Sequence, residues 1–429
     1  MLVKTYGSAV FGVSATTITI EVNIDKGASM NIVGLPDAAI KEAHQRIRAA
    51  LINTGYELPV KGITINMAPA DIRKEGSAYD LPMAIGILAA SEQIPHENLE
   101  HFVIMGELSL DGKLRPIRGV LPIAIEAKRA GFKGMFVPAE NAREAAIAGG
   151  MEVYGVADIS EVTGFFSGNL TLTPVVADTN GEFLEKLDHY TVDFSDVKGQ
   201  ENIKRAFEIA AAGGHNIILI GPPGAGKTML AKRLPTILPP LSLAEALETT
   251  KIHSVAGKMK RGDSLISVRP FRAPHHTISD VALVGGGSFP QPGEISLAHH
   301  GVLFLDELPE FKRTVLEVMR QPLEDRFITI SRSKFSVEYP ASFMLVASMN
   351  PCPCGFYNHP DKECQCGSVV VQKYLNKVSG PLLDRIDIHI EVTPVGFQEL
   401  SAQRSGERSA SIRTRVMEAR KVQKTRFAN

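Results

Sequence analysis

Apolar and polar residues alternate near the start of the chain, which predicts a half-buried strand. Over residues 17–24, Ile18, Ile20, Val22 and Ile24 share one face and polar residues occupy the other. The pattern that follows predicts a helix from Asp37 to Gly55, a strand at 63–67, a helix from about 80 to 92, and a hairpin turning at Asp111-Gly112. The first part of the chain is therefore expected to be an α+β domain.

A second pattern centres on residues 216–228. The β-branched apolar run 217–220 predicts a buried strand and residues 229–234 predict a helix, with a glycine-rich loop between them. This order is typical of a phosphate-binding loop, because glycines let backbone N–H groups turn toward phosphates and the helix N-terminus adds partial positive charge. An incidental glycine-rich turn is the alternative, which the flanking strand and helix disfavour. The predicted nucleotide-binding residues are Gly221, Pro222, Pro223, Gly224, Ala225, Gly226, Lys227 and Thr228, with Lys227 on the β- and γ-phosphates and Thr228 on Mg²⁺.

Another apolar strand, at residues 301–305, ends in two carboxylates, Asp306 and Glu307. We expect Asp306 to hold Mg²⁺, directly or through water, and Glu307 to orient and deprotonate the attacking water. A strand that ends in Asp-Glu is common by itself. Together with the phosphate-binding loop, it predicts hydrolysis of a nucleoside triphosphate.

Composition sets limits on the domain count and on the partners. A chain of 429 residues is expected to form two or three domains, and 44% hydrophobic with 22% charged residues is typical of a globular protein. Neither a signal peptide nor an apolar run long enough to span a membrane is visible, so we expect a cytoplasmic protein without membrane contact. The net charge of −1 gives no overall attraction to nucleic acid, so DNA contacts must come from local basic loops.

The four cysteines lie close together as Cys352-x-Cys354 and Cys364-x-Cys366. Four thiolates are the usual ligands of a structural zinc ion, and a cytosolic compartment disfavours disulfides. We therefore predict a Zn²⁺ site, with free buried thiols as the alternative and His359 as a substitute ligand. His275 and His276 could also bind zinc, but no further metal-binding residue lies near them at suitable spacing. We therefore favour a structural or phosphate-sensing role for both.

Two stretches of the first half, residues 74–83 and 106–131, resemble the proteolytic domain of Lon proteases. They are more similar to its non-proteolytic version in RadA-type recombination proteins. Lon's pattern places a nucleophilic serine and a lysine where this chain has Ala78 and Ile123, which can neither attack a carbonyl nor take a proton, and Ser77 lies one position away. The resemblance implies a Lon-protease/S5-like domain without a catalytic dyad, serving assembly or nucleic-acid binding.

The second half resembles AAA+ ATPases. Residues 193–200 are similar to the segment that lies along the adenine in these proteins, which implies ATP as the nucleotide. A strand at 343–347 leads to Asn350, which matches sensor 1, the asparagine that places water against the γ-phosphate. A turn-forming asparagine before Pro351 is the alternative.

A further AAA+ resemblance concerns an arginine. Residues 379–387 match the box that carries the arginine finger in this clade, so Arg385 is expected to act in the site of a neighbouring subunit. The alternative is an ion pair with Asp384 or Asp387 of the same subunit.

Three motifs narrow the resemblance to the magnesium-chelatase-like branch and, with the Lon-like domain, to the ComM/YifB family over essentially the whole chain. This resemblance implies a hexameric, ATP-driven DNA motor for branch migration in recombination, including natural transformation. A chelatase-type ATPase that remodels a partner protein is the second class, and a Lon-like protease is a third class that Ala78 and Ile123 disfavour. The motifs lie at residues 269–279, 283–287 and 292–301.

Two basic regions are candidate DNA contacts. Residues 326–339 predict a β-hairpin with basic residues at its tip, and residues 251–272 are also basic. Such loops around a hexamer pore could follow a phosphate backbone without reading bases, whereas ordinary solvated charges are the alternative. The predicted DNA-binding residues are Arg332, Lys334, Lys258, Lys260 and Arg261.

The expected domains follow from these assignments. AAA+ motors carry a C-terminal helical lid with a sensor 2 arginine, and no candidate lid bundle follows Pro394, so we expect the lid to be missing and leave sensor 2 unassigned. The regions are a Lon-like domain at 1–166, a linker at 167–190, an αβα AAA+ core at 191–395 with a cysteine insert at 352–366, and the start of a C-terminal helical region at 396–429.

Overall fold

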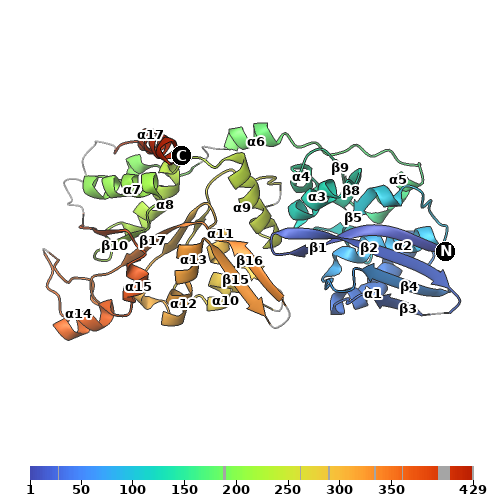
Figure 1. Cartoon of the computed structure of the whole chain (residues 1–429), viewed down its shortest axis with the longest axis horizontal. Coiled ribbons are helices and arrows are strands. Elements are labelled where there is room, and N and C mark those ends of the chain that lie inside the picture. The colour runs from blue at the N-terminus through green and yellow to red at the C-terminus, as the bar shows by residue number, and fades with distance from the viewer. Residues whose placement is uncertain are drawn as a thin grey trace. The chain divides into compact units, whose positions relative to one another are not determined.

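The chain folds into two compact units (Figure 1). One unit contains Met1–Glu182 and Thr250–Leu265, and the other contains Phe183–Thr249 and Ile266–Asn429. Residues 250–265 lie inside the stretch that the sequence assigns to the ATPase core, yet they pack with the first unit. The computed structural model describes residues 1–27, 29–186, 190–260, 262–287, 290–332, 335–359, 361–394 and 406–427.

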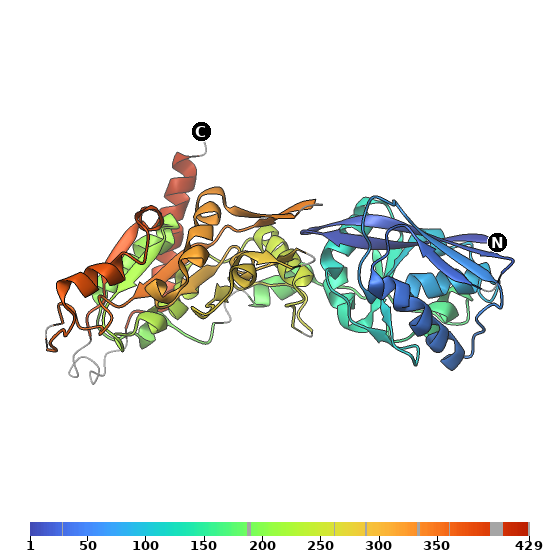
Figure 2. The same cartoon turned by 90° about the horizontal axis from the view of Figure 1, so that it is seen from below.

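The first unit is built on a mixed seven-stranded sheet in the order β3-β4-β2-β1-β5-β8-β9. Figure 2 shows its long β1–β2 hairpin with the dark blue helix α1 below it. Its strands are β1 (Leu2–Phe11), β2 (Ser14–Asp25), β3 (Met30–Val33), β4 (Gly62–Ala68), β5 (Phe102–Ile104), β6 (Glu107–Leu108), β7 (Leu114–Arg115), β8 (Gly134–Pro138) and β9 (Glu152–Val156). Its helices are α1 (Ala38–Asn53), α2 (Asp80–Ala90), α3 (Val120–Arg129), α4 (Ala142–Ala146) and α5 (Ile159–Phe166).

The strand, helix and hairpin that the sequence pattern predicts for this unit are present in the structure. Ile18, Ile20 and Val22 of β2 are fully buried against α2 and α3, because alternate side chains of a strand point to one face. Asp37 caps α1 by accepting a hydrogen bond from the Ile40 N–H at 2.8 Å. The hairpin at Asp111-Gly112 is also confirmed, as β6 and β7 pair around it. The α+β architecture of the first domain is therefore confirmed.

A helix forms where the sequence predicts only a linker. Helix α6 (Thr179–Lys186) lies within residues 167–190 and half-buries its carboxylate Glu182, which accepts a hydrogen bond from Arg143 at 2.7 Å. Phe183 of the same helix is buried. Eight residues give too short a window for helical periodicity to stand out from a Pro- and Gly-containing context.

The second unit contains a five-stranded, wholly parallel sheet in the order β11-β14-β17-β10-β18. Its strands are β10 (Ile217–Ile220), β11 (Phe271–Arg272), β14 (Val302–Leu305), β17 (Met344–Met349) and β18 (Ile388–Glu391), and two hairpins add β12 (Gly285–Gly286), β13 (Gln291–Pro292), β15 (Phe327–Arg332) and β16 (Phe335–Pro340). Its helices are α7 (Glu201–Gly213), α8 (Lys227–Ile237), α9 (Leu243–Val255), which continues into the first unit, α10 (Asp280–Val284), α11 (Glu294–Leu297), α12 (Arg313–Val318), α13 (Arg320–Asp325), α14 (Ser368–Leu375), α15 (Gly380–Leu383) and α17 (Ser409–Arg426).

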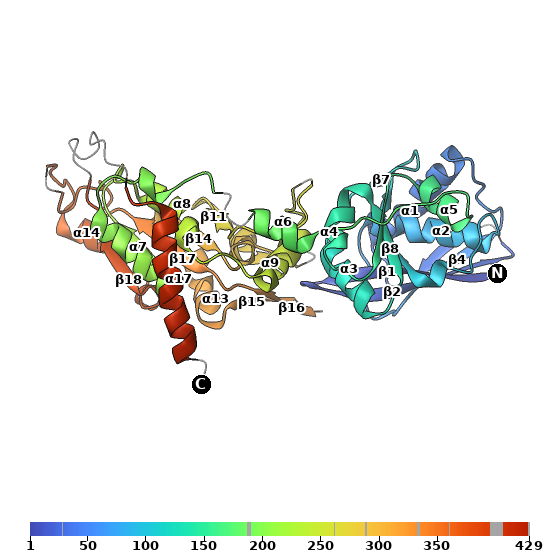
Figure 3. The same ribbon diagram turned by 90° about the horizontal axis from the view of Figure 1, so that it is seen from above.

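Helices cover this sheet, which explains its apolar strands. Every residue of β14 and β17 is buried, as expected for central strands of a parallel sheet. Helices α7 and α8 pack beside the sheet, and α17 lies across both of them, with Ile412 and Val416 buried (Figure 3). The predicted α/β class with a parallel αβα core is confirmed.

The C-terminal region is described from residue 406 to residue 427 and contains α17. Two arginines of α17 are engaged by the core: Arg415 pairs with Glu208 at 2.7 Å, and Arg420 donates to the Ala211 carbonyl at 2.8 Å. Neither reaches the phosphate-binding loop in the described part of the chain. No described helix has the length and apolar character needed to cross a membrane.

Candidate nucleotide-binding site

The loop between β10 and α8 has the backbone that its glycines predict. Gly224 and Gly226 have φ values of +80° and +86°, a left-handed conformation that disfavours other residues. A Cβ added at either position would meet nothing within 4 Å. The left-handed backbone therefore favours glycine at both positions. The absence of neighbours within 4 Å leaves space beside the loop for a ligand.

Lys227 occupies the interior of this loop. Its ammonium group donates to the carbonyls of Gly221 at 2.7 Å and Pro222 at 2.9 Å and to the Asn350 side-chain oxygen at 3.1 Å. Burial lowers the pKa of Lys227, and the charges of Asp306 and Glu307 oppose that effect. The structure thus brings the predicted loop lysine and Asn350 into direct contact.

Thr228 and Asp306 also meet, because β14 and β17 end at the same edge of the parallel sheet as β10. The Thr228 hydroxyl donates to the Asp306 carboxylate at 2.7 Å, and the Ser348 hydroxyl donates to its other oxygen. Ser348 is a residue that the sequence analysis missed, although a buried hydroxyl in the otherwise apolar β17 is a usable signal. A cavity of about 420 Å³ is lined by Pro223, Gly224, Ala225, Gly226, Lys227, Thr228, Met229, Asp306, Glu307, Ser348, Met349 and Asn350.

Glu307 lines this cavity and has an unusual backbone conformation. Its φ of +55° is left-handed, which for a residue other than glycine costs on the order of 1 kcal/mol. His276 Nδ1 lies 3.2 Å from its carboxylate. The sequence analysis missed this partner because His276 follows β11, far away along the chain, and reaches Glu307 only through the strand order.

Arg385 lies outside this cavity. Its guanidinium pairs with Glu324 of α13 and donates to the Pro381 carbonyl. The alternative partners Asp384 and Asp387 are not the ones used, and Asp387 instead accepts a hydrogen bond from the Asn216 N–H at 3.1 Å. The structure therefore does not bring Arg385 together with the other predicted catalytic residues of its own subunit.

Comparisons with known proteins agree with this geometry. Residues 193–400 match the family model of magnesium chelatase, subunit ChlI, and residues 20–141 match that of subunit ChlI of Mg-chelatase. The chain is 47% identical to the YifB protein of Salmonella typhimurium, over 97% of this chain and 81% of the relative. It is 44% identical to competence protein ComM of Haemophilus influenzae, over 98% and 82%.

The chain belongs to the ComM/YifB family. This family is one of magnesium-chelatase-like AAA+ ATPases, whose cofactors are ATP and Mg²⁺. The chain is also 32% identical to Lon protease 2 of Bacillus subtilis, over 36% of this chain and 31% of the relative.

The Lon-like positions of this ComM/YifB protein lack a catalytic pair. Ala78 is partly buried and Ile123 is 1% exposed in the core. Ser77 donates a hydrogen bond to the Glu107 carboxylate. The recorded partner of Ser77 is therefore a carboxylate, and the Ser-Lys pairing of Lon is not present at these positions.

The cysteines of this ComM/YifB protein gather into one cluster just after β17. The Sγ atom of Cys364 lies 3.7 Å from that of Cys352 and 3.6 Å from that of Cys354, and Cys352 and Cys354 are 3.3 Å apart. All four thiols are free and their Sγ atoms lie within 4.8 Å of one another. His359 accepts hydrogen bonds from backbone N–H groups through Nδ1 and is outside this cluster.

A second group of possible metal ligands contains Glu248, His299 and His300. Its buried histidine, His299, carries a proton on the nitrogen that would have to bind the metal. The Ser342 N–H donates to His299 Nδ1 at 3.0 Å, so the neutral ring carries its proton on Nε2, which faces Glu248 at 3.3 Å. Burial lowers the pKa of His299 to about 4 and keeps the ring neutral. His300 Nε2 lies 2.9 Å from the same Glu248 carboxylate, so the three residues form a polar cluster with no free ring nitrogen on His299 for a metal.

The structure describes only part of the predicted DNA-binding set. Lys258 and Lys260 are exposed and belong to the first unit. Two other arginines of the basic stretch have structural partners. Arg269, whose side chain is 10% exposed, donates to the carbonyls of Pro239 and His300, and Arg272 forms two 2.6 Å hydrogen bonds with Glu294. Arg261, Lys334 and the side chain of Arg332 lie outside the described residues.

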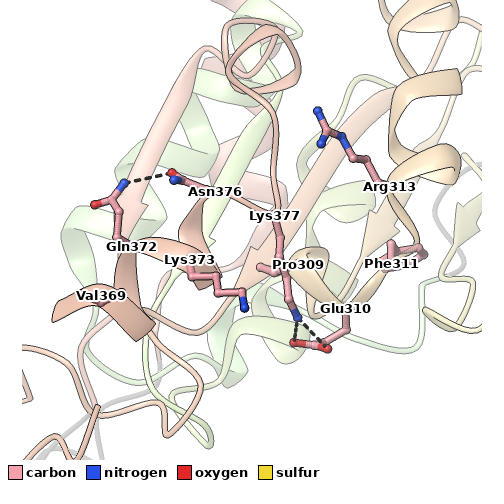
Figure 4. A pocket seen from close by; sticks show the side chains of 9 residues that line it. All are labelled: Pro309, Glu310, Phe311, Arg313, Val369, Gln372, Lys373, Asn376 and Lys377. Atoms are coloured by element: carbon pink, nitrogen blue, oxygen red, sulfur yellow. Dashed lines mark hydrogen bonds and ion pairs between the residues drawn. The ribbon is translucent and has the colours of Figure 1, made fainter. Parts of the chain in front are cut away.

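A basic hollow that sequence patterns did not indicate lies between α12 and α14 (Figure 4). Its volume is about 790 Å³. Lys377 pairs with Glu310 at 3.2 Å, whereas Arg313 and Lys373 have no ion-pair partner among the described residues. The lining residues are Pro309, Glu310, Phe311, Arg313, Val369, Gln372, Lys373, Asn376 and Lys377.

Proposed function

We propose that the second unit hydrolyses ATP at the cavity between Lys227 and Glu307. The contact of Thr228 with Asp306, beside the contact of Lys227 with Asn350, is the observation that carries this proposal. Thr228 and Asp306 are hard oxygen ligands suited to Mg²⁺, which neutralises phosphate charge when bound. Lys227 then exchanges its loop carbonyls for phosphate oxygens, because an ammonium group forms stronger hydrogen bonds with anions.

Glu307 and Asn350 act on water in this proposal. Both line the cavity: Glu307 follows β14, and Asn350 follows the neighbouring strand β17. Glu307 takes the proton of the attacking water, and the Asn350 amide orients that water against the γ-phosphate. Arg385 completes the site of a neighbouring subunit, which is consistent with its position outside its own cavity.

The proposed work of this ATPase is to move branched DNA as a hexamer during recombination and natural transformation. The similarity to a relative whose name is competence protein ComM supports it. Exposed cations also support it, namely Lys258 and Lys260 of the first unit and Arg313 and Lys373 of the second. These groups suit a phosphate backbone, and contacts with phosphates carry no sequence information.

A branched-DNA unwinding assay with ATP tests the proposal. Glu307→Gln is expected to keep ATP and DNA binding and to lose unwinding and hydrolysis, because the amide cannot take a proton. The matched control is Glu317→Gln, which lies outside both the nucleotide cavity and the basic hollow, pairs with Arg320, and should unwind DNA normally. If wild type hydrolyses ATP but neither binds nor unwinds DNA, the DNA-motor proposal fails.

A second candidate is a chelatase-type ATPase that remodels a partner protein. The match of residues 193–400 to a magnesium chelatase subunit favours it. The Lon-like first unit, which extends the similarity to ComM and YifB along nearly the whole chain, counts against it. Stimulation of ATP hydrolysis by a partner protein, without any effect of DNA, would decide for this candidate.

We also infer that the four cysteines hold a structural zinc ion. With Zn–S bonds of about 2.3 Å, tetrahedral thiolates lie about 3.8 Å apart, close to the distances from Cys364 to Cys352 and Cys354. Backbone N–H groups of Phe356 and Gln365 donate to Cys354 and lower its pKa to about 6, which favours the thiolate. Elemental analysis of protein purified without chelator should give about one zinc per chain, and less than about half an equivalent would refute the site.

A further inference from the structure

The cysteine cluster touches the phosphate-binding loop. Gly355 follows Cys354 directly and has a φ of +85°. A Cβ built on Gly355 would lie 2.6 Å from Cδ and 3.3 Å from Cγ of Pro223, which lines the nucleotide cavity. Real Cβ atoms do not approach so closely, so the backbone of the cluster is packed against the loop with no room for a side chain.

The cluster also follows the predicted sensor residue. Cys352 is fully buried two positions after Asn350, and the Gly355 N–H donates to the Cys352 carbonyl at 3.0 Å. On the other side, Tyr374 of α14 forms a hydrogen bond with the Asn350 backbone. The segment that carries the thiols is therefore fixed at its start to Asn350 and at its turn to Pro223.

The geometry points to a zinc knuckle that forms one wall of the ATP site, so that nucleotide affinity depends on zinc. The inference rests on the proposed ATPase and zinc sites. With zinc bound, the four thiolates fix the turn at Gly355, and Gly355 holds Pro223 in place. Without zinc, the thiols take up protons and no ion joins them, so the turn loosens and the loop and Asn350 lose their common support. Gly355 is thus a positioning residue for the phosphate-binding loop.

The decisive variant is Gly355→Ala, which leaves every thiol in place. We expect it to retain about one zinc per chain, because no ligand is removed, and to bind Mg²⁺-ATP at least tenfold more weakly, because Pro223 must move. Two glycine controls separate packing from other effects. Gly131→Ala introduces the same left-handed strain at φ +82° in the first unit, and Gly367→Ala adds a methyl beside the cluster; neither added Cβ meets anything within 4 Å. Both should bind ATP like wild type.

The dependence on zinc is tested with Cys352→Ser and with wild-type protein from which a chelator has removed the metal. Both should lose zinc and bind ATP at least tenfold more weakly, and adding Zn²⁺ back should restore the affinity of the stripped wild type only. Thermal unfolding of each protein is measured in parallel, so that a change in ATP affinity is compared among folded chains.

The outcomes separate the three proposals. If wild type does not bind ATP above the level of Lys227→Ala, the ATPase proposal fails. If wild type binds ATP but contains no zinc, the zinc site fails. If zinc is present and both Gly355→Ala and the stripped protein bind ATP as wild type does, the knuckle does not support the loop and the further inference is overturned.

Discussion

At the residue scale, the site consists of polar groups whose hydrogen bonds already connect them to one another. Lys227 is bonded to Asn350, and Thr228 and Ser348 both donate to Asp306. Such contacts preorganise the donors and acceptors that the phosphates and the metal need. Substitutions of the groups that hold phosphate should therefore weaken ATP binding. Substitutions that affect Glu307 should instead slow ATP hydrolysis.

His276 is expected to fix the orientation of Glu307. Replacing it with alanine removes the partner 3.2 Å from the carboxylate, so kcat for ATP hydrolysis should fall about tenfold while the Kd of ATP stays unchanged. Steady-state kinetics and nucleotide titration give the two quantities. His215→Ala is the control, because His215 pairs with Asp387 at 3.3 Å and lies outside the nucleotide cavity. Equal kcat values for the two variants would contradict this role of His276.

His299 should make the stability of the second unit depend on pH. Burial lowers its pKa to about 4 from an ordinary value of 6.5, so the unfolded chain binds the proton first as the pH falls. The stabilisation is complete above pH 6.5 and is lost by about pH 4, with a total near 3 kcal/mol. Chemical unfolding at several pH values measures it. His299→Gln should show a smaller loss over this range, and an identical pH profile would rule out His299 as the source.

At the element scale, the ends of parallel strands decide which residues meet. Strands β10, β14 and β17 are neighbours, so the loop after each one reaches the same edge of the sheet. Helices α12 and α14 follow two of these loops and bring Arg313 and Lys373 to one hollow (Figure 4). A basic surface thus lies close in sequence to both Glu307 and Asn350.

Charge reversal tests this surface as a DNA contact. The double variant Arg313→Glu, Lys373→Glu should bind single-stranded DNA more weakly and with a salt dependence shallower by about 0.7 per lost phosphate contact. Titration at several salt concentrations measures both effects. The charge-matched control, Lys421→Glu with Lys424→Glu, changes two exposed cations of α17. If the two double variants have the same affinity, the hollow between α12 and α14 is not a specific DNA contact.

At the scale of the whole molecule, two units of different architecture share one chain, and each has its own core. Residues 250–265 return to the first unit: the Ser254 carbonyl accepts a hydrogen bond from the Gly119 N–H at 3.1 Å, and its hydroxyl donates to the buried Glu144. Burial raises the pKa of Glu144, because the charged carboxylate is unfavourable away from water. The hydrogen bond from Ser254 offsets part of that cost. A segment far along the chain thus completes the packing of the first unit.

Subunit mixing tests whether Arg385 acts in trans. Arg385→Ala and Glu307→Gln should each be inactive alone, but a mixture should recover part of the ATPase activity, because an intact Glu307 can face an intact Arg385 across an interface. Mixing Glu307→Gln with Lys227→Ala is the control and should stay inactive, since both lesions affect the same half of the site. A first mixture as inactive as this control would place Arg385 outside any shared site.

The sequence alone determined the features that are contiguous along the chain. The glycine-rich loop, Asp306 with Glu307, the burial of β2 and α1, and the paired cysteines follow from local spacing and periodicity, and so does the α/β class. These patterns carry their own geometry, because 3.6- and 2-residue periods fix which side chains share a face.

Only the tertiary structure decided which distant residues meet. The order of the strands brings His276 to Glu307 and Ser348 to Asp306. Packing of loops set Gly355 against Pro223, paired Arg385 with Glu324, and returned residues 250–265 to the first unit. Such contacts depend on the summed burial of both units, and no short stretch of sequence contains that information.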